Sequence, residues 1–324
     1  MSWFFNADYE SFLFSGRSHY TFNSSKLNQE FEYLIHFLED GPIFTTKKYS
    51  KGYIERIEAL SGKRFMTENS PENARPWWAS IGDYEADKIL HSKITSTKFG
   101  IEKGIIQDAC LVSLKNFDPK EGHVYKMEGE LSGRGHLLWP RDKKKISVLL
   151  ENGLVLIEEP LRERVRDFSA LFLSAKKKVV YENAVDRHFQ YKGTRLIAPK
   201  LSLEQEKEYE KALGDICQFY LKLGASFPFS VDSYIYKQNN CEILNPLCEV
   251  NARKTMGYAA LKLAELFQAP CASMVLLNRA QKVFKDDRIL VLSPPENQFQ
   301  TVFLKAKSPE ELKELEALLF SGEL

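Results

Sequence analysis

The stretch CEVNARKTMG, residues 248–257, follows the stretch SVDSYIYK, residues 230–237, across a polar turn at 238–240. Val, Ile and Tyr favour strands, and Asn residues favour turns. The sequence therefore predicts a hairpin with strands at 230–237 and 241–250. Because alternate residues of a strand point to the same side, the hairpin gathers its polar side chains on one face.

Four residues of this hairpin predict chemistry. Glu249 and Asn251 are two positions apart and share a face, and Arg253 shares it if the strand continues. Asp232 of the first strand adds a third oxygen ligand. Mg²⁺ prefers such carboxylate and amide oxygens together with phosphate, and an arginine can neutralise a phosphoryl group in transfer. On spacing alone, a surface hairpin with solvated charges is the more common interpretation.

An upstream stretch, YKMEGELSGRGHLLW at 125–139, places Lys126 on a predicted strand before a small-residue loop. That loop consists of Ser132, Gly133, Arg134 and Gly135. Glycines allow backbone N–H groups to close on phosphate oxygens, and a lysine supplies a point charge. An ordinary hairpin turn explains the same residues.

A third stretch, VLIEEPLRERVRDF at 155–168, changes from apolar to charged at Glu158-Glu159-Pro160-Leu161. Pro160 lacks an N–H and interrupts regular pairing, which leaves nearby backbone groups available to an adenine edge. A strand that simply reaches a charged loop is the alternative.

Composition excludes several classes of protein. The 324 residues include 45 basic and 44 acidic side chains, so no overall field draws the chain to nucleic acid or to an anionic membrane. No apolar run approaches the roughly 18–20 residues that span a bilayer, and the N-terminus lacks a signal-peptide pattern, so we expect a cytoplasmic protein. Five scattered cysteines without C-x-x-C spacing predict reduced thiols.

The predicted elements alternate between helical and strand-rich regions. Helices are expected at 27–40, 53–62, 83–100, 142–153, 203–223, after 257 and at 309–320, the last with a capping box formed by Ser308 and Glu311. Strands are expected in PIFTT (42–46), HVYKMEG (123–129), LVLIEEP (154–160), FSALFLS (168–174) and KKVVYE (177–182), and a connection at 68–80. Trp77-Trp78 is expected to pack between domains, with an aromatic substrate wall as the alternative.

The order of these motifs resembles the ATP-grasp superfamily, and most of all its members that carry a pre-ATP-grasp domain. VYKMEGELSGRGH, IEEPLRERVRDFS, FSVDSYIY and CEVNARKTMG are similar to the superfamily's lysine and glycine loop, Glu-Pro hinge, Asp strand and Glu-x-Asn-x-Arg motif. The resemblance implies an α+β ATP-grasp fold, in which two lobes clasp ATP, preceded by an α/β pre-ATP-grasp domain. It implies domains at 1–95, 96–160 (small lobe) and 161–324 (large lobe).

The resemblance also implies residue roles. Lys126 and Lys93 contact ATP phosphates, and the loop from Ser132 to Gly135 closes over them. Glu158, Glu159, Pro160 and Leu161 contact adenine, and Asp167 binds the ribose. Asp232, Glu249 and Asn251 hold Mg²⁺, with two ions expected, and Arg253 contacts the γ-phosphate.

The activity implied is that of an ADP-forming ligase that activates a carboxylate as an acylphosphate and joins it to an amine or thiol. A non-catalytic ATP-binding module and an ATP-grasp phosphotransferase are the alternatives. The expected partners are small-molecule acids and amines, without nucleic acid or membrane, and a homodimer is compatible with them. Arg187, His188, Tyr191 and Arg195, in a loop expected at 183–200, are candidate substrate contacts, although solvated loop charges are the more common interpretation.

Overall fold

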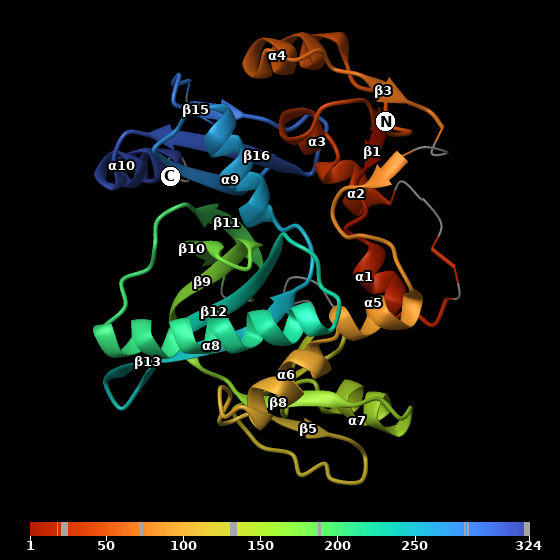
Figure 1. Ribbon diagram of the computed structural model, residues 1–324, viewed down its shortest axis with the longest axis vertical. Coiled ribbons are helices and arrows are strands. Elements are labelled where there is room, and N and C mark those ends of the chain that lie inside the picture. The colour runs from red at the N-terminus through yellow and green to blue at the C-terminus, as the bar shows by residue number, and fades with distance from the viewer. Residues whose placement is uncertain are drawn as a thin grey trace.

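The computed structural model describes residues 1–17, 19–20, 25–70, 74–129, 135–186, 189–281, 283 and 285–320. Within these residues the chain forms two four-stranded sheets and one eight-stranded sheet. Figure 1 shows the N-terminal elements at the upper right, the small sheet with β5 and β8 at the bottom, and the eight-stranded sheet between them and to the left. No helix in the described part of the chain combines the length and apolarity that a bilayer crossing requires.

The N-terminal sheet is parallel and has the order β3-β2-β1-β4. Its strands are β1 (Ser2–Phe4), β2 (Ile43–Phe44), β3 (Thr67–Glu68) and β4 (Ala74–Pro76). The helices along this part of the chain are α1 (Tyr9–Leu13), α2 (Lys26–Phe31), α3 (Leu34–Leu38) and α4 (Lys51–Ser61). Strand β2 lies on one side of β1, and β4 lies on the other side. The loops after β1 and β4 therefore meet at a topological switch point, which is where open α/β sheets bind ligands.

The connection predicted at 68–80 is wrong in part, because it contains β4. Ser2 pairs with Ala74 and Phe4 with Pro76, so this segment is a strand beside β1. Three residues are too few to show a period, and their partner lies about seventy positions earlier. Local turn formers therefore concealed the pairing.

Two predicted helices are each divided in the structure. The segment 83–100 forms α5 (Tyr84–Leu90) and α6 (Lys93–Glu102), and the segment 27–40 forms α2 and α3. Ser92 ends the first run because its Oγ accepts a hydrogen bond from the Thr95 backbone N–H at 3.0 Å and caps α6. The break directs α6 toward the hairpin that carries Glu249.

The small sheet is antiparallel, with the order β5-β8-β6-β7. It consists of β5 (Cys110–Val112), β6 (His123–Lys126), β7 (His136–Leu138) and β8 (Leu156–Pro160). Helix α7 (Lys143–Glu151), predicted at 142–153, buries Ile146 and Leu150 against Tyr125 and Leu156 of the sheet. Lys126 thus ends the strand that lies next to β8.

The eight-stranded sheet is antiparallel, with the order β13-β12-β9-β10-β11-β14-β16-β15. Its strands are β9 (Glu163–Ser174), β10 (Lys177–Val185), β11 (Tyr191–Arg195), β12 (Phe229–Gln238), β13 (Cys241–Asn251), β14 (Cys271–Asn278), β15 (Ile289–Val291) and β16 (Phe299–Ala306). Its helices are α8 (Leu203–Lys222), α9 (Met256–Leu266) and α10 (Pro309–Phe320). The predicted hairpin and the predicted helix at 203–223 are confirmed.

Several details of this part of the chain differ from the predictions. Strand β9 begins at Glu163, five residues before the predicted start, and the loop expected at 183–200 contains the end of β10 and all of β11. The capping box of α10 is only half formed, because Ser308 Oγ accepts from the Glu311 N–H but the Glu311 carboxylate accepts from Lys307 instead of Ser308. The strands β9 and β10 extend beyond the predicted ranges, and β11 replaces part of a predicted loop, because each pairs with a neighbouring strand of the sheet. Local sequence propensity does not report such pairing.

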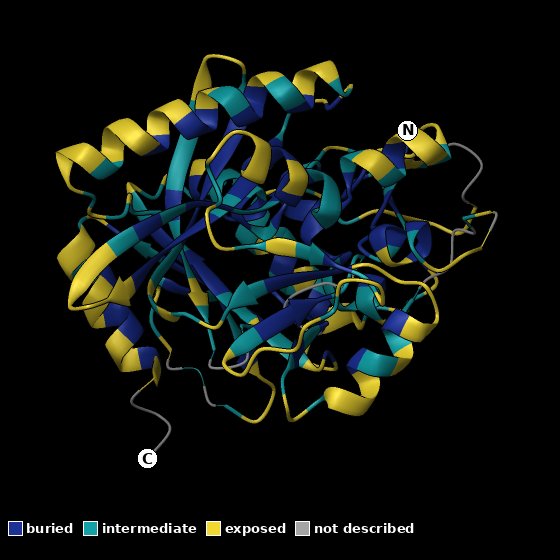
Figure 2. Cartoon of the chain, turned by 90° about the horizontal axis from the view of Figure 1, so that it is seen from below, coloured by how far each residue is buried: buried dark blue, intermediate teal, exposed yellow. Residues whose placement is uncertain are grey.

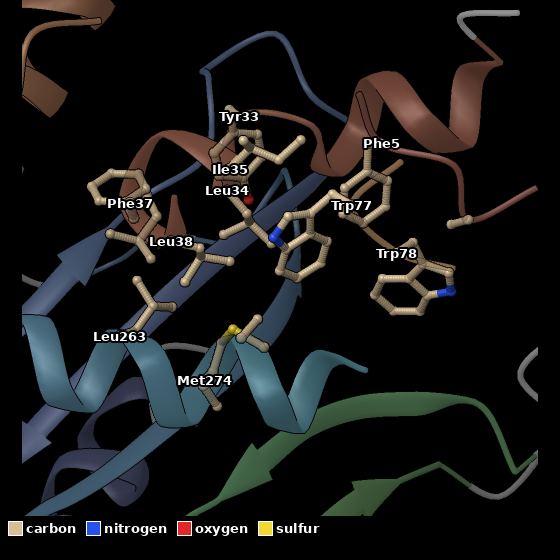
Figure 3. Packing of buried hydrophobic residues seen from close by; sticks show 14 of the residues in the cluster. Phe5, Tyr33, Leu34, Ile35, Phe37, Leu38, Trp77, Trp78, Leu263 and Met274 are labelled. Atoms are coloured by element: carbon tan, nitrogen blue, oxygen red, sulfur yellow. The ribbon is translucent and has the colours of Figure 1, made fainter. Parts of the chain in front are cut away.

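The N-terminal sheet shares a hydrophobic core with α9, β14 and β16, as Figure 3 shows for Trp77, Leu263 and Met274. The Trp77 ring lies 5.5 Å from Phe5 and 6.2 Å from Tyr258, between centroids, and its side chain is 1% exposed. The packing predicted for Trp77 is confirmed. Figure 2 shows the burial pattern of the whole chain: the exposed faces of the helices point outward, and the strands between them are largely buried.

Candidate functional site

Asp232, Glu249 and Asn251 meet near the end of the hairpin formed by β12 and β13. Asp232 pairs directly with Glu249 across the two strands. Asn251 Nδ2 donates to Asp232 Oδ2 at 2.9 Å, and Ser169 Oγ of the neighbouring strand β9 donates to Asp232 Oδ1 at 2.6 Å. The structure therefore brings the three candidate metal ligands together.

The electrostatics of this acidic group suit a cation. Burial, followed by the negative charge of Glu249, raises the pKa of Asp232 to about 7. Burial also opposes ionisation of Glu249, but Lys93 and Lys126 together outweigh it and lower the pKa of Glu249 below its usual value. Among the described residues, no group of three or more His, Cys, Asp or Glu side chains is arranged to hold a metal ion, so the metal hypothesis depends on this set of two carboxylates and one amide. A divalent cation would offset both the cost of burying the two carboxylates and the repulsion between them.

Two lysines approach the acidic group from other elements. Lys93, the first residue of α6, has its Nζ 2.9 Å from Glu249 Oε2. Lys126, at the end of β6, has its Nζ 2.5 Å from Glu159 Oε1 and 3.9 Å from Cys248 Sγ. Because Cys248 precedes Glu249 on β13, Lys126 links the small sheet to the hairpin. Both lysines predicted to contact phosphate thus lie beside the acidic group.

Cys248 lies between two cations but remains a thiol at neutral pH. Its Sγ is 3.7 Å from Arg164 Nη2 as well as 3.9 Å from Lys126 Nζ. Burial has the largest influence and outweighs both cations, so the pKa of Cys248 lies above its usual value. This cysteine therefore lacks the activation of a nucleophilic thiolate.

Arg253 is held by a buried carboxylate of the N-terminal part of the chain. Its Nη2 donates to Glu10 Oε2 at 2.8 Å, and its Nε lies 2.8 Å from Glu10 Oε1. His91 Nδ1 lies 3.0 Å from the same Oε1, and the guanidinium lies 4.7 Å from the Trp78 ring centroid. Burial opposes ionisation of Glu10, but Arg253 and His91 outweigh it and hold the pKa of Glu10 well below its usual range.

This arrangement places Arg253 at the switch point of the N-terminal sheet. Glu10 lies in α1, just after β1, and Trp78 follows β4. Arg253 itself follows the last residue of β13, two positions from Asn251. The loops at the switch point of the parallel sheet therefore lie against Arg253, two residues from Asn251 of the acidic group.

The predicted hinge is divided between the two faces of β8. Glu159, Pro160 and Leu161 line a narrow pocket of about 10 Å³ together with Val124, His136, Arg162, Arg164, Phe189 and Tyr234. Glu158 points to the other face, beside Tyr125, where it is 2% exposed and pairs with Lys120 at 2.7 Å. The Glu158 side chain does not join the group around Lys126.

Arg164 lines this hinge pocket, and Asp167 contacts Arg164 without lining the pocket itself. Arg164 Nη1 donates to Asp167 Oδ1 at 2.8 Å. The guanidinium lies 4.0 Å from the Tyr234 ring centroid and 4.7 Å from that of Phe189. Burial, opposed by Arg164, raises the pKa of Asp167. The two rings and the arginine fill most of the space beside Glu159.

The remaining predicted residues separate into two groups. Ser132, Gly133 and Arg134, like Arg187 and His188, lie outside the described residues, whereas Gly135 is a buried turn residue directly before β7. Arg195 lies away from the acidic group, because it pairs with Glu182 at 2.9 Å and with Glu316 at 2.5 Å. Tyr191 contacts Thr194 through its hydroxyl group.

The fold of this chain is similar to that of several solved structures, whereas its sequence has no match among family models or curated proteins. Among solved structures, N5-carboxyaminoimidazole synthetase from Staphylococcus aureus complexed with ADP is similar, with a TM-score of 0.54, 14% identity, and 86% of this chain and 85% of that chain covered. Phosphoribosylamine–glycine ligase from Thermotoga maritima has a TM-score of 0.50 and 11% identity, with 90% and 94% covered.

A third similar structure is larger. Pyruvate carboxylase from Rhizobium etli matches with a TM-score of 0.54 and 13% identity, over 84% of this chain and 31% of that chain. The three matches share one architecture with the sheets described above. The chain has an ATP-grasp fold.

Sequence reasoning missed several residues that the ATP-grasp fold brings to this site. Glu10 contacts both Arg253 and His91, which come from distant parts of the chain, and no local signal marks Glu10 or His91. Arg164 belongs to the stretch at 155–168. Its position between Pro160 and Asp167 is the sequence signal that could have identified it as a site residue. Ser169 is two residues after Asp167, so the alternation of side chains along a strand could have placed it on the same face as Asp167.

Because the pKa of Asp232 is raised, we expect any binding of Mg²⁺ by the acidic group to depend on pH. A metal needs the ionised carboxylate, and the group is mostly protonated below pH 7. We expect Mg²⁺ affinity to rise about tenfold between pH 6 and pH 8, measured as Mg²⁺-induced thermal stabilisation without nucleotide. Without metal the sign is opposite, because a raised acid pKa contributes stability at low pH that is lost as pH rises toward 7. Asp232→Asn should remove both trends, and an unchanged pH profile in that variant would contradict the assignment.

Proposed function

We propose that this protein is an ATP- and Mg²⁺-dependent ligase that activates a carboxylate as an acylphosphate and joins it to an amine or thiol. One observation carries the proposal: Lys93, Lys126 and the acidic group of Asp232, Glu249 and Asn251 lie together between the small sheet and the hairpin. The names of the similar structures, a synthetase, a ligase and a carboxylase, support it. Functional domains at 1–95, 96–160 and 161–324 belong to the same proposal.

The nucleotide would lie between β8 and the eight-stranded sheet. Glu159 and the backbone from Glu158 to Leu161 would contact adenine, Asp167 would bind the ribose, and the loop from Ser132 to Gly135 would close over the phosphates. A purine needs more space than the narrow hinge pocket offers. Arg164 or Phe189 would therefore move when the nucleotide binds.

The side chains of Asp232, Glu249 and Asn251 fit Mg²⁺. They supply oxygen ligands. Burial, followed by repulsion from Glu249, raises the pKa of Asp232, and a divalent cation would relieve that repulsion. When bound, Mg²⁺ would neutralise charge on the β- and γ-phosphate oxygens and orient them. Lys93, now paired with Glu249, would then be available to a phosphate.

The proposed reaction has two steps. A carboxylate oxygen of the acid attacks the γ-phosphorus of ATP, and the bond from that phosphorus to the ADP oxygen breaks, which leaves an acylphosphate and ADP. The nucleophile then attacks the acyl carbon, loses a proton, and expels inorganic phosphate. Lys126 and Arg253 would neutralise the transferred phosphoryl group, so no covalent bond to the protein is needed.

Arg253 would change partners during this cycle. It is ion-paired with Glu10 in the structure, at the switch point where the acid or the amine would enter. A phosphoryl group would compete with the Glu10 carboxylate for the same guanidinium. His91, already 3.0 Å from Glu10, would remain as a partner for that carboxylate.

The test is an ADP-release assay with purified protein, ATP and Mg²⁺, across a panel of small acids and amines. We expect release that requires both an acid and a nucleophile, and a loss of about 10²-fold or more in Lys126→Met. Lys144→Met, on the exposed face of α7, is the matched control and should retain activity. A stable phosphorylated product formed without any nucleophile would indicate a phosphotransferase instead. ATP binding without ADP release from any pair would indicate a binding module.

A further inference from the structure

A second pocket, of about 530 Å³, lies between α4 and the segment from Val291 to Gln300. Its volume falls within the range of about 300–1,000 Å³ that small-molecule sites occupy. One wall comes from the first turns of α4, and the other comes from β15, β16 and the loop that joins them. Any molecule in this pocket would contact both the N-terminal part of the chain, at α4, and its C-terminal part, from Arg279 to Gln300.

The pocket carries positive charge. Arg56 and Arg279 both line it, and the described residues that line it include no carboxylate. Glu296, next to the lining residue Pro295, already lies 3.7 Å from Lys47 Nζ. The pocket therefore presents two guanidinium groups to an anion.

Arg56 is held in position by two backbone carbonyl groups of the opposite wall. Its Nη2 donates to the Ser293 carbonyl at 3.0 Å, and its Nη1 donates to the Val291 carbonyl. Its guanidinium also lies 5.3 Å from the Tyr53 ring centroid. Arg279, in contrast, is exposed, and no carboxylate in the described part of the chain pairs with it. One arginine is thus fixed, and the other is available to close on a ligand.

The rest of the lining favours an anion with an apolar part. Gly52, in the first turn of α4, lines the pocket without a side chain, and the positive end of the helix dipole adds to the two arginines. Val291, Pro294 and Pro295 supply apolar surface. This combination suits a phosphate group joined to a ring or a short hydrocarbon.

The pocket is separate from the proposed ATP site. Glu249 lies on β13, at one edge of the eight-stranded sheet, and Val291 lies on β15, at the other edge. Seven strand spacings of roughly 4.8 Å put these edges on the order of 30 Å apart. We infer that the pocket is a second binding site, for a small organic phosphate, that joins α4 to the C-terminal strands.

The test uses the whole chain with phenyl phosphate, inorganic phosphate and phenol as probes, followed by calorimetry and thermal shift. We expect phenyl phosphate to bind and to raise the Tm, inorganic phosphate to bind more weakly, and phenol not to bind at concentrations up to about 10 mM. Arg279→Ala should weaken phenyl phosphate at least about tenfold, because it removes a charge-assisted hydrogen bond. Lys51→Ala, which removes an exposed cation beside Gly52 on α4, should leave the affinity unchanged.

Two further variants distinguish this site from the ATP site. Lys126→Met should retain phenyl phosphate binding and lose ADP binding, whereas Arg279→Ala should show the reverse. Arg279→Gln, which keeps the length of the side chain, replaces Arg279→Ala if the latter lowers the Tm without ligand. The inference is overturned if phenyl phosphate does not bind the native chain, if neither Arg279 variant weakens it, or if Lys126→Met abolishes its binding.

Discussion

Glu249→Gln is expected to lower Mg²⁺-dependent ADP release by about 10²–10³-fold, with little change in the fold. The substitution keeps the size of the side chain but removes the charge that faces both Asp232 and Lys93. Without the Glu249 charge, the pKa of Asp232 should fall, since that charge is the second largest cause of its elevation. The remaining site would hold one carboxylate and two amides, a weaker set for Mg²⁺. Initial rates of ADP release over a range of Mg²⁺ concentrations measure the effect.

The matched control is Glu242→Gln. Glu242 is an exposed residue of the same strand, β13, and pairs across the hairpin with Lys237. Its substitution changes the net charge by the same amount but leaves the acidic group intact, so ADP release should equal that of the native protein. Asn251→Ala should resemble Glu249→Gln. If both site variants keep the native rate while Glu242→Gln does the same, the metal assignment is wrong.

The hairpin could be predicted because its signals are local. Strand-forming residues on both sides of Asn239 and Asn240 define the turn, and both residues have positive φ angles, 51° and 64°, which asparagine tolerates. Alternation then places Glu249 and Asn251 on one face. The register at Asp232 could not be predicted from the turn. The turn places Tyr234 opposite Asn245, and a bulge between Asp232 and Tyr234 then shifts the pairing so that Asp232 lies opposite Glu249.

The N-terminal sheet could be predicted only in part, because its strands have two or three residues each. Such strands show no period, and their pairing depends on partners far along the chain. Ile43 pairs with Trp3 and with Thr67, and Ala74 pairs with Ser2. Burial in a shared core, with Trp77 at its centre, stabilises these pairs, and local propensity does not report it.

The hinge shows what alternation leaves undecided. Glu158 and Glu159 are adjacent, so they must point to opposite faces of β8. Only the pairing of β8 with β6 shows that Glu159 shares a face with Lys126, while Glu158 is opposite Tyr125. The sequence therefore predicted the location of the hinge but not which glutamate faces the lysine.

Arg253→Met is expected to destabilise the fold by about 3–5 kcal/mol, the cost of leaving one partner of a buried ion pair alone. Glu10 and Arg253 are 7% and 8% exposed, and Met keeps most of the apolar contact with Trp78. The sign with pH follows from the lowered pKa of Glu10. The native pair contributes stability above the unfolded pKa of glutamate, and this contribution is lost as pH falls through that value and below. In Arg253→Met this acid sensitivity should weaken, because the Glu10 carboxylate loses the larger of its two stabilising partners and keeps only His91.

The double variant Glu10→Gln with Arg253→Met separates the structural role of Arg253 from its proposed role in catalysis. Removing both charges should restore most of the lost stability, since no uncompensated charge remains buried, and urea unfolding measures the recovery. ADP release should stay low in the double variant, because the group proposed to contact the γ-phosphate is still missing. Glu10→Gln alone should keep measurable turnover, because the arginine remains. If the double variant recovers turnover together with stability, Arg253 serves only to join the N-terminal elements to the hairpin, and another cation must neutralise the transferred phosphoryl group.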